Sequence, residues 1–399
     1  MGEIKYHLAE DTIDREDRVS VAQWITQEPA PQLTMGPLTR QFEEKWSQWL
    51  GRKYSVFCNS GSSANLLMYA AILASKKLRN NRIRVIVPSV GWGTTITPVM
   101  QLKEFEDPII CEADPDTFGL DLDHLEDLLK RYQPSIVMMV HVLGVPHKMT
   151  EIMALKDRYG FYLLEDACAA GGSSWYGRNV GTFGDMASFS AYYGHQFSTV
   201  EGGLVSTDDK ELYEMMLMLR SHGWGKDLPV ETYDRLIAYY NINDFNKPFT
   251  FFEAGYNLRP TDIQAFIGLR QIDKLKWFIR CRWENHQLYK KLLDSHVTFQ
   301  KYDKGSIVCS IHFGALAKNK EQREKIVAAL NSHGIENRMF SAGNLGLHPF
   351  WFERYGKFSA PTADRIHNCG FFLPNNPSLN PEDINFICNI VIESLKSKT

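Results

Sequence analysis

The sequence predicts an α/β fold whose central sheet is mostly parallel, and three observations support this prediction. Short apolar runs alternate with longer amphipathic ones up to Arg259-Pro260, which is the pattern of strands alternating with helices. Hydrophobic residues make up 44% of the chain and charged residues 23%, so a large core can form. The 399 residues exceed one minimal domain and suit one large unit plus a smaller one.

The predicted strands of the large unit are short and apolar. We expect them at residues 54–58, 84–88, 109–112, 136–141 and 161–165, with a hairpin-like pair at 187–191 and 203–206. Helices are expected over residues 64–75 and 148–159. Because helices connect strands in this pattern, neighbouring strands are expected to run parallel.

The pattern changes after Pro260. A long helix is expected from Thr261 to near Leu293, followed by two strands, near residues 306–313 and 335–340. We place a domain boundary inside this helix, so that residues 1–275 form the large domain and residues 276–399 a smaller C-terminal α/β domain.

Two further segments carry local expectations. Residues 225–247 have weak periodicity and are expected to form an excursion from the large domain. The Met-rich run at residues 214–220 has helical spacing and is expected to pack in the core rather than to bind a ligand.

Charge and cysteine usage narrow the class of protein. Lys and Arg number 44 and Asp and Glu 47, a net charge of -3 without long like-charge runs, which argues against a nucleic-acid or membrane-surface role. No apolar run is long enough to span a bilayer. The seven cysteines are scattered and form no CxxC pair, so no metal site is expected. Reduced thiols are typical of a soluble, cytoplasmic protein.

Four features of the large unit could carry chemistry, and each has an ordinary structural alternative. Residues 59–64 form a Ser/Gly turn that opens a helix, which is either a phosphate cradle or a plain N-cap. Asp166 ends a buried strand and could hold a ring nitrogen protonated or cap the next segment. Trp92 could stack on a flat ring or simply pack. His195, in a loop, could exchange protons near neutrality or be an ordinary surface or hydrogen-bonded residue.

The joint arrangement decides between these readings, because the features follow one order along one α/β unit. The chain resembles the DegT/DnrJ/StrS sugar aminotransferases over nearly its whole length. The residues that carry the resemblance are 34–43, 59–65, 165–166, 181–184, 189–190, 201–203, 207–209, 255–259 and 372–374. The resemblance implies the aspartate aminotransferase fold (fold type I) with pyridoxal 5'-phosphate (PLP) or pyridoxamine 5'-phosphate (PMP) as cofactor.

The resemblance also implies a role for each matching residue. The cofactor phosphate would be bound by Gly61, Ser62 and Ser190. Asp166 would bind the pyridine nitrogen, and Trp92 would stack on the ring. Asn257 would reach the phosphate from a partner subunit, since active sites in this family lie at a dimer interface, so a homodimer with shared active sites is expected.

Two positions depart from the family pattern. Ala169 stands where the family usually has Gln, His or an acid, so a hydrogen bond to the phenolic oxygen of the cofactor would have to come from elsewhere. His195 occupies the position of the lysine that binds PLP covalently, and an imidazole cannot form that stable link. The 3-dehydratases of 4-keto-6-deoxy sugars in this family carry histidine here. The chain is similar to their branch without an iron–sulfur cluster, through residues 92–95, 194–195, 201–203, 222–224 and 228–229.

The resemblance implies the following reaction. The PMP amine condenses with the C4 ketone of a nucleotide-linked 4-keto-6-deoxy sugar, with GDP as the expected nucleotide. His195 takes a proton from the cofactor and then, once protonated, assists departure of the C3 hydroxyl. Glutamate is the expected amino donor that restores PMP.

Three alternatives remain open at this point. The chain could be a sugar aminotransferase, or another lyase that uses free PMP. It could also be an inactive relative that acts as a regulator or scaffold, although the retained site residues argue against decay. A metal-dependent hydrolase is the third alternative, but the sequence shows no credible spacing of metal ligands.

His222 and Trp224 could line a nucleotide or substrate channel, or they could have a structural role.

Overall fold

A seven-stranded sheet organises the larger part of the chain. The computed structural model describes residues 4–75, 77–78 and 83–396. The strands of the central sheet, in sequence order, are β1 (Tyr54–Cys58), β2 (Val85–Pro88), β3 (Ile109–Cys111), β4 (Ile136–Val140), β5 (Tyr162–Asp166), β8 (Met186–Ser190) and β9 (Gly203–Thr207). Their spatial order is β1-β9-β8-β5-β4-β2-β3. β9 runs antiparallel to β1 and β8 and the other pairs are parallel, so the predicted α/β class and mostly parallel sheet are confirmed.

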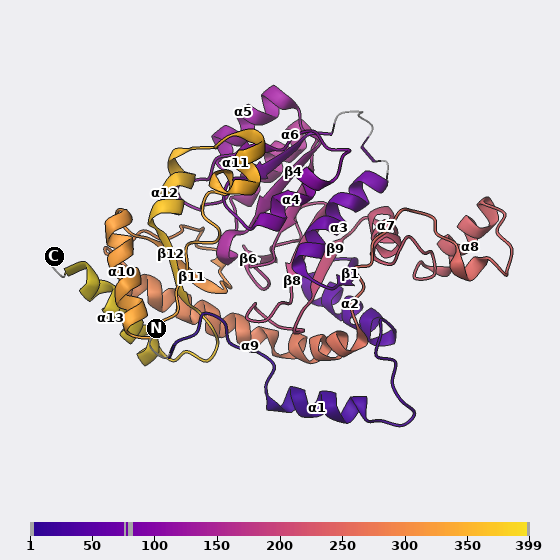
Figure 1. Ribbon diagram of the computed structural model, residues 1–399, viewed down its shortest axis with the longest axis horizontal. Coiled ribbons are helices and arrows are strands. Elements are labelled where there is room, and N and C mark those ends of the chain that lie inside the picture. The colour runs from indigo at the N-terminus through magenta and orange to yellow at the C-terminus, as the bar shows by residue number, and fades with distance from the viewer. Residues whose placement is uncertain (1–3, 76, 79–82, 397–399) are drawn as a thin grey trace.

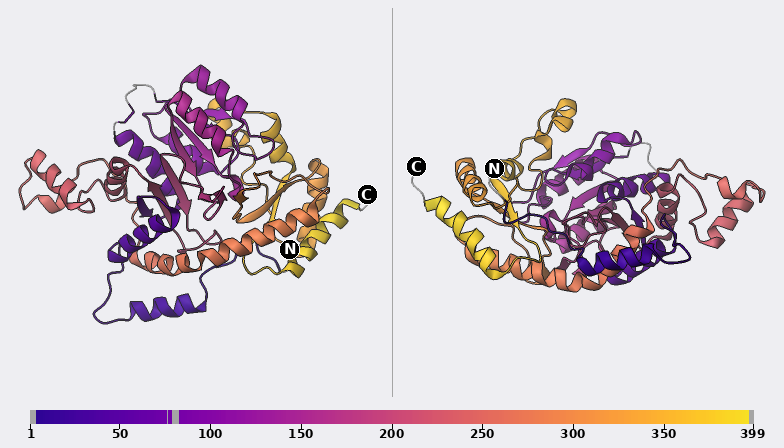
Figure 2. Two further views of the ribbon diagram at one scale, coloured as in Figure 1. Left: turned by 180° about the vertical axis from the view of Figure 1, so that it is seen from behind. Right: turned by 60° about the horizontal axis from the view of Figure 1, so that its bottom comes forward.

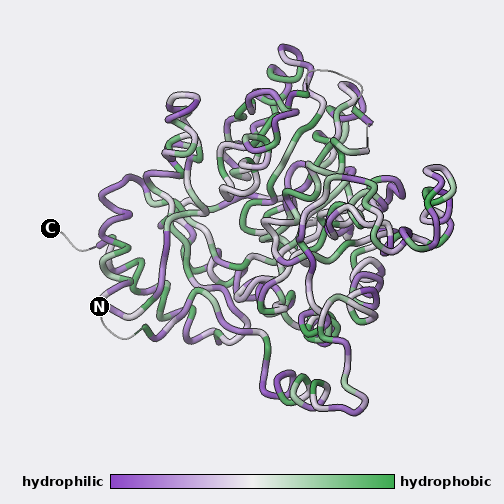
Figure 3. The backbone as a smooth tube through the Cα atoms, turned by 45° about the vertical axis from the view of Figure 1, so that its right-hand side comes forward, coloured by the Kyte–Doolittle hydropathy of each residue, from purple (hydrophilic) through white to green (hydrophobic). Residues whose placement is uncertain are grey.

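Helices cover both faces of this sheet (Figures 1 and 2). They are α2 (Pro37–Leu50), α3 (Gly61–Ala74), α4 (Gly93–Gln101), α5 (Leu122–Tyr132), α6 (Met149–Tyr159) and α7 (Lys210–Arg220). Alternate residues of one strand point to opposite faces. Ile136 and Met138 of β4 therefore pack with α3 and α4, whereas Val137 and Met139 pack with α5 and α6. Burial on both faces explains why the central strands are almost continuously apolar, as the hydropathy colouring shows (Figure 3).

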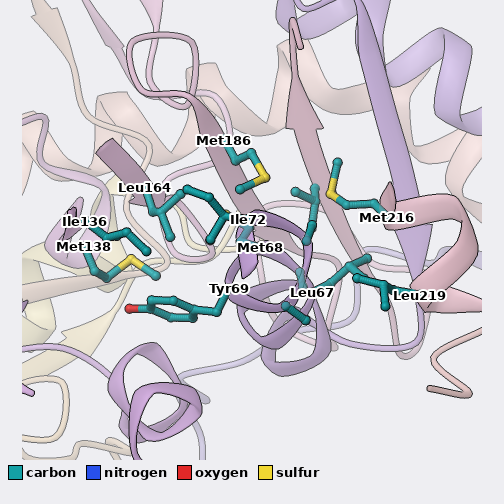
Figure 4. Close-up of a cluster of buried hydrophobic side chains, with 14 of the residues drawn as sticks. Leu67, Met68, Tyr69, Ile72, Ile136, Met138, Leu164, Met186, Met216 and Leu219 are labelled. Atoms are coloured by element: carbon teal, nitrogen blue, oxygen red, sulfur yellow. The ribbon is translucent and has the colours of Figure 1, made fainter. Parts of the chain in front are cut away.

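The Met-rich run lies in the core, as predicted. Met216 and Leu219 of α7 pack in one apolar cluster with Leu67 and Ile72 of α3 (Figure 4). Met186 of β8 belongs to the same cluster. Unbranched methionine side chains suit this position because they fill irregular gaps between helix and sheet.

One long helix, α9 (Asp262–Leu293), connects the two parts of the chain. Its N-cap is Thr261, whose side chain accepts from the Gln264 backbone in a capping box. Leu275 and Phe278 belong to the apolar cluster that covers the large sheet, whereas Tyr289 belongs to the C-terminal cluster. The division into residues 1–275 and 276–399 stays a prediction.

The C-terminal part contains a two-stranded antiparallel sheet and several helices. The elements are β11 (His312–Leu316), β12 (Gly370–Pro374), α10 (Lys320–Ser332), α11 (Pro349–Tyr355), α12 (Pro361–Cys369), α13 (Pro381–Lys396) and the short η3 (Leu345–Leu347). β10 (Ser306–Ile307) instead joins β6 (Ser174–Trp175) and β7 (Arg178–Asn179) in a separate small sheet. The strand predicted at residues 306–313 is thus divided between two sheets.

The strand predicted at residues 335–340 is wrong. This segment forms two isolated bridges instead, Ile335 with Tyr6 and Arg338 with Phe372. A strand needs consecutive pairing with one neighbour, and these residues bridge to two different segments. The bridge to Tyr6 also places the N-terminal segment beside the C-terminal part of the chain.

Two helices lie outside the main layers. α1 (Arg15–Ile25) runs alongside α9, and α8 (Val230–Tyr239) projects from the body of the molecule, together with η2 (Lys247–Phe249) (Figure 1). The predicted excursion at residues 225–247 is therefore confirmed, although its weak periodicity did not reveal the helix. A third short element, η1 (Val142–Gly144), follows β4.

His147 gives this fold a pH-dependent stability. The side chain is buried, and its Nε2 accepts a hydrogen bond from the Leu120 backbone N at 3.1 Å. The pKa of His147 is lowered from 6.5 to about 3, chiefly by burial and also by His141 and Lys148, against the opposing effects of Asp114 and the Val140 backbone. The folded protein therefore holds this ring neutral, while the unfolded chain binds a proton below pH 6.5.

We expect the stability from His147 to be complete above pH 6.5 and to decline as the pH falls toward 3. At pH 5 the loss should be about 2 kcal/mol, because each pH unit between the two pKa values is worth about 1.4 kcal/mol. Denaturant unfolding at pH 7 and pH 5 measures it. In His147→Gln the side-chain oxygen can accept the same hydrogen bond without titrating. Equal pH dependence in this variant and the wild type would contradict the assignment.

Candidate active site

Four predicted site residues come together where β5 and β8 end and α3 begins. The carboxyl ends of parallel strands are where open α/β sheets bind ligands. Asp166 is the last residue of β5, Ser190 the last of β8, and Gly61 the first of α3. His195 follows β8 in a short loop and is linked to Asp166 through residue 168, as described below.

The N-terminus of α3 forms a cradle of hydrogen-bond donors. Ser60 caps the helix, and its Oγ accepts from the Ser63 backbone N at 3.0 Å. A Cβ added at Gly61 would lie 2.7 Å from the Ser190 Cβ, so glycine lets Ser190 approach the helix end. Ser62 is exposed, and its Oγ lies 3.0 Å from Thr94 Oγ1. Free backbone N–H groups, hydroxyls and the positive end of the helix together suit a phosphate.

Asp166 is a buried carboxylate held by neutral donors. It is 4% exposed and accepts from Thr95 Oγ1 at 2.6 Å, Asn65 Nδ2 at 2.9 Å and the Cys168 backbone N at 3.1 Å. Asn65 is itself oriented, because its Oδ1 accepts from Ser188 Oγ at 2.6 Å. Within the described residues no Lys or Arg forms an ion pair with Asp166. Its negative charge is therefore available to a cationic group of a ligand.

His195 presents one free ring nitrogen. Its Nδ1 lies 2.8 Å from the Cys168 carbonyl oxygen, which can only accept, so Nδ1 carries the hydrogen. Nε2 then holds the lone pair and can take a proton. Burial lowers the pKa of His195 to about 4, and the cation of Arg282 adds to this, against the opposing effects of the Cys168 carbonyl and Asp166. The imidazole is therefore neutral at pH 7.

Glu165, the other acidic residue at this strand end, serves the fold. Its fully buried carboxylate accepts from the backbone N of Gly181, Phe183 and Gly184, and it bonds to His141 Nε2 at 3.0 Å. Burial alone would raise the pKa of Glu165, but these bonds and the charge of His141 and Arg52 lower it. Of the two acids, Asp166 is the one left for chemistry.

Trp92 and Asn257 lie at the exposed side of the site. Trp92 is 62% exposed and is the N-cap of α4, two residues before Thr94, the partner of Ser62. Asn257 is also exposed, and the adjacent Leu258 carbonyl accepts from the Asn59 backbone N at 3.0 Å. The ring stacking of Trp92 and the reach of Asn257 to a partner stay predictions. Ala169 is half-buried and packs against an apolar cluster.

Sequence reasoning missed four residues that hold the site together. They are Asn65, Thr95, Cys168 and Arg282, which orient Asp166 or fix the loop of His195. Asn65 and Thr95 stand at the ends of the segments 59–65 and 92–95, but their shared partner, Asp166, lies far along the chain at the end of β5. Cys168 acts through backbone atoms, and Arg282 lies far along the chain, so the sequence offered no signal for either.

Comparison with known proteins identifies the family. Residues 12–392 match the model of the DegT/DnrJ/EryC1/StrS aminotransferase family. The chain belongs to this family. The predicted fold is shown as well, since solved structures with the aminotransferase fold cover nearly the whole chain.

Three relatives in the DegT/DnrJ/EryC1/StrS family are informative. GDP-4-keto-6-deoxy-D-mannose 3-dehydratase of Yersinia pseudotuberculosis is 33% identical over 97% of this chain and 98% of its own length. A solved structure of the E. coli enzyme of that name with bound hydrated PLP has a TM-score of 0.88 at 28% identity, covering 98% of this chain and all of its own. A solved structure of a GDP-4-keto-6-deoxymannose-3-dehydratase with a trapped PLP-glutamate geminal diamine also has a TM-score of 0.88 at 28% identity. It covers 97% of this chain and all of its own.

The described part of the chain contains neither a cluster of metal ligands nor a membrane-spanning helix. No group of three or more His, Cys, Asp or Glu side chains in residues 4–75, 77–78 and 83–396 could hold a metal ion. Over the same residues, no helix combines the length and apolarity that a bilayer crossing needs.

The contact of Gly61 with Ser190 predicts the effect of one added methyl group. In Gly61→Ala the new Cβ would meet Ser190 at 2.7 Å and the Cys168 Sγ at 3.0 Å, so part of the cradle must shift. We expect a loss of about 1–3 kcal/mol, the usual cost of overpacking, seen as a lower midpoint in thermal unfolding. Gly93→Ala is the matched control, because Gly93 also opens a helix but has open space at its Cβ. An equal effect of both substitutions would contradict the contact.

Proposed function

We propose that this protein removes the C3 hydroxyl from GDP-4-keto-6-deoxymannose with PMP as cofactor, which makes it a 3-dehydratase of the lyase class. One observation carries the proposal: a neutral histidine with a free Nε2 stands where the family has its cofactor-linking lysine. The relatives named as GDP-4-keto-6-deoxymannose 3-dehydratases support it, because they match nearly the full length of the chain.

The residues present fit PLP or PMP. The α3 cradle of Gly61 and Ser62 with Ser190 would hold the phosphate, since the lack of a Cβ at Gly61 lets the Ser190 hydroxyl lie beside the helix N-terminus. Asp166, buried without a cationic partner in the described residues, would hold the ring nitrogen protonated. Trp92 would cover the ring with its exposed indole. When bound, the cofactor supplies an amine that condenses with the C4 ketone and a ring that accepts electrons.

His195 would act twice, first as base and then as acid. Its neutral Nε2 takes a proton, since Nδ1 is already occupied by the bond to the Cys168 carbonyl. Burial and Arg282 depress the pKa of the ring, so the protonated form is a stronger acid than an ordinary imidazolium. It can therefore pass the proton from Nε2 to the departing C3 hydroxyl. Because imidazole forms no stable covalent link to the cofactor, the side chain at position 195 does not compete with the sugar for the cofactor.

The donor, the assembly and the location belong to the same proposal. Glutamate would restore PMP, which the PLP-glutamate adduct in the solved dehydratase structure supports. We infer a homodimer in which Asn257 reaches the partner's cofactor phosphate, supported by the exposure of this residue, which leaves it accessible to a second subunit. We also infer a cytoplasmic location, because all seven cysteines are free thiols.

Product analysis tests the proposal. The protein is incubated with PLP, glutamate and GDP-4-keto-6-deoxymannose, and the products are identified by mass spectrometry. We expect ammonia and a 4-keto-3,6-dideoxy sugar. An amino sugar that keeps its C3 hydroxyl would overturn the proposal in favour of a sugar aminotransferase. Absence of a cofactor absorbance band after addition of PLP would instead indicate an inactive relative.

Substitution of His195 tests its role within that reaction. His195→Asn should lower kcat by about 10²–10⁴-fold, the usual contribution of an acid–base group. His333→Asn removes an exposed histidine of the C-terminal part and should keep full activity. Full dehydration activity in His195→Asn would refute the assigned role.

A further inference from the structure

Arg282 is a buried cation without a carboxylate partner. Its side chain, on α9, is fully buried, and within the described residues no Asp or Glu forms an ion pair with it. The guanidinium donates to backbone carbonyls instead. Nη2 donates to the His195 carbonyl oxygen at 2.8 Å, and Nη1 donates to the carbonyl oxygens of Ile311, at 3.2 Å, and Asn375. The Nε is buried and has no hydrogen-bond partner.

Burying such a cation is unfavourable in free energy. An isolated charge in the interior loses its hydration, and backbone carbonyls return only part of that free energy. Burial lowers the pKa of Arg282 to about 10, so the group stays protonated at neutral pH. Arg220 shows the ordinary solution in the same chain, because this equally buried arginine is paired with Glu43 and lies 3.8 Å from Asp227. The missing partner at Arg282 calls for a specific reason.

The three acceptors come from three separate segments. The His195 carbonyl belongs to the loop after β8, Ile311 directly precedes β11, and Asn375 directly follows β12. Asn375 returns a bond from its Nδ2 to the Arg282 carbonyl at 3.3 Å. The planar guanidinium therefore joins the loop of His195 to the ends of both strands of the C-terminal sheet.

The charge of Arg282 also acts on the ring of His195. The titratable and charged groups that face this ring are Asp166 at the end of β5, Arg282 on α9 and His312 at the start of β11, and the Tyr192 ring lies edge-on at 5.9 Å. Of these, Asp166 favours the protonated ring, whereas Arg282 disfavours it. His312 is held neutral by its own burial and by Arg282.

We propose that Arg282 is a positioning residue for His195, which fixes the backbone of the loop through the carbonyl of residue 195 and so sets where the imidazole lies. A carboxylate partner would compete for the guanidinium and cancel its charge, which explains why none is present among the described residues. The catalytic consequence rests on the proposed function of His195, whereas the positioning and the electrostatic effect are properties of this chain alone.

Titration of His195 tests the electrostatic effect without substrate. In protein labelled with ¹³C at histidine Cε1, the His195 resonance is assigned by its loss in His195→Asn. In Arg282→Met we expect the pKa of His195 to rise by about one pH unit, because a nearby cation has been removed. In Arg282→Lys it should stay nearly unchanged. Arg220→Lys is the matched control at a buried arginine that does not contact the loop, and it should leave the titration as in the wild type.

The rate measures the positioning. Lysine keeps the charge but cannot reach three carbonyls from three segments, so Arg282→Lys should lower kcat by about tenfold or more with little change in the KM for glutamate. Arg220→Lys should retain kcat. An unchanged His195 titration in a folded Arg282→Met protein, or full kcat in Arg282→Lys, would overturn the proposal. If Arg282→Met does not fold, the kcat of Arg282→Lys decides. If the wild type does not dehydrate the sugar, the His195 titration still tests the effect of Arg282. Failure of the proposed function can therefore be told apart from failure of the proposal for Arg282.

Discussion

The backbone of Cys168 is the constraint on which the site depends, because it connects the acid and the base. Its N–H donates to the Asp166 carboxylate at 3.1 Å, and its carbonyl accepts from His195 Nδ1 at 2.8 Å. One peptide segment thus fixes the anion, which would hold the ring nitrogen of a cofactor, and the tautomer of the imidazole, which would move the proton. The first bond spans two residues, whereas the second spans 27 and joins the segments that follow the paired strands β5 and β8.

Around this link, the site is held by neutral groups rather than by salt bridges. Thr95 and Asn65 bind Asp166 from α4 and α3, and Ser188 orients Asn65 from β8. Hydrogen bonds of this kind satisfy the oxygens of a buried carboxylate without pairing it with a cation. The Arg282 cation beside His195 is likewise bound by neutral groups. Its guanidinium donates to backbone carbonyls, so no carboxylate cancels its charge. Burial lowers the pKa of His195 most, the Arg282 cation also lowers it, and Asp166 opposes both.

Much of this architecture could be predicted from the sequence, for physical reasons that differ between elements. The strand at residues 54–58 and the helix that ends near Leu293 were predicted well, because burial on two faces and long-range periodicity leave strong patterns. The segment at residues 335–340 was not, because Ile335 and Arg338 bridge to two different segments instead of pairing along one strand. Periodicity records which residues are buried, and not which neighbour buries them.

The same division applies to the site. The sequence by itself determined the α/β class, the family pattern, and the replacement of a lysine by His195, since each depends on residue identity and spacing along the chain. Only the tertiary structure decided that Asp166 lacks a cationic partner in the described residues, that Nε2 of His195 is the free nitrogen, and that Arg282 anchors the loop. These facts depend on contacts between residues up to 101 positions apart, such as Asn65 with Asp166, and no local pattern encodes such contacts. Folding brings the groups together, and burial then sets their protonation.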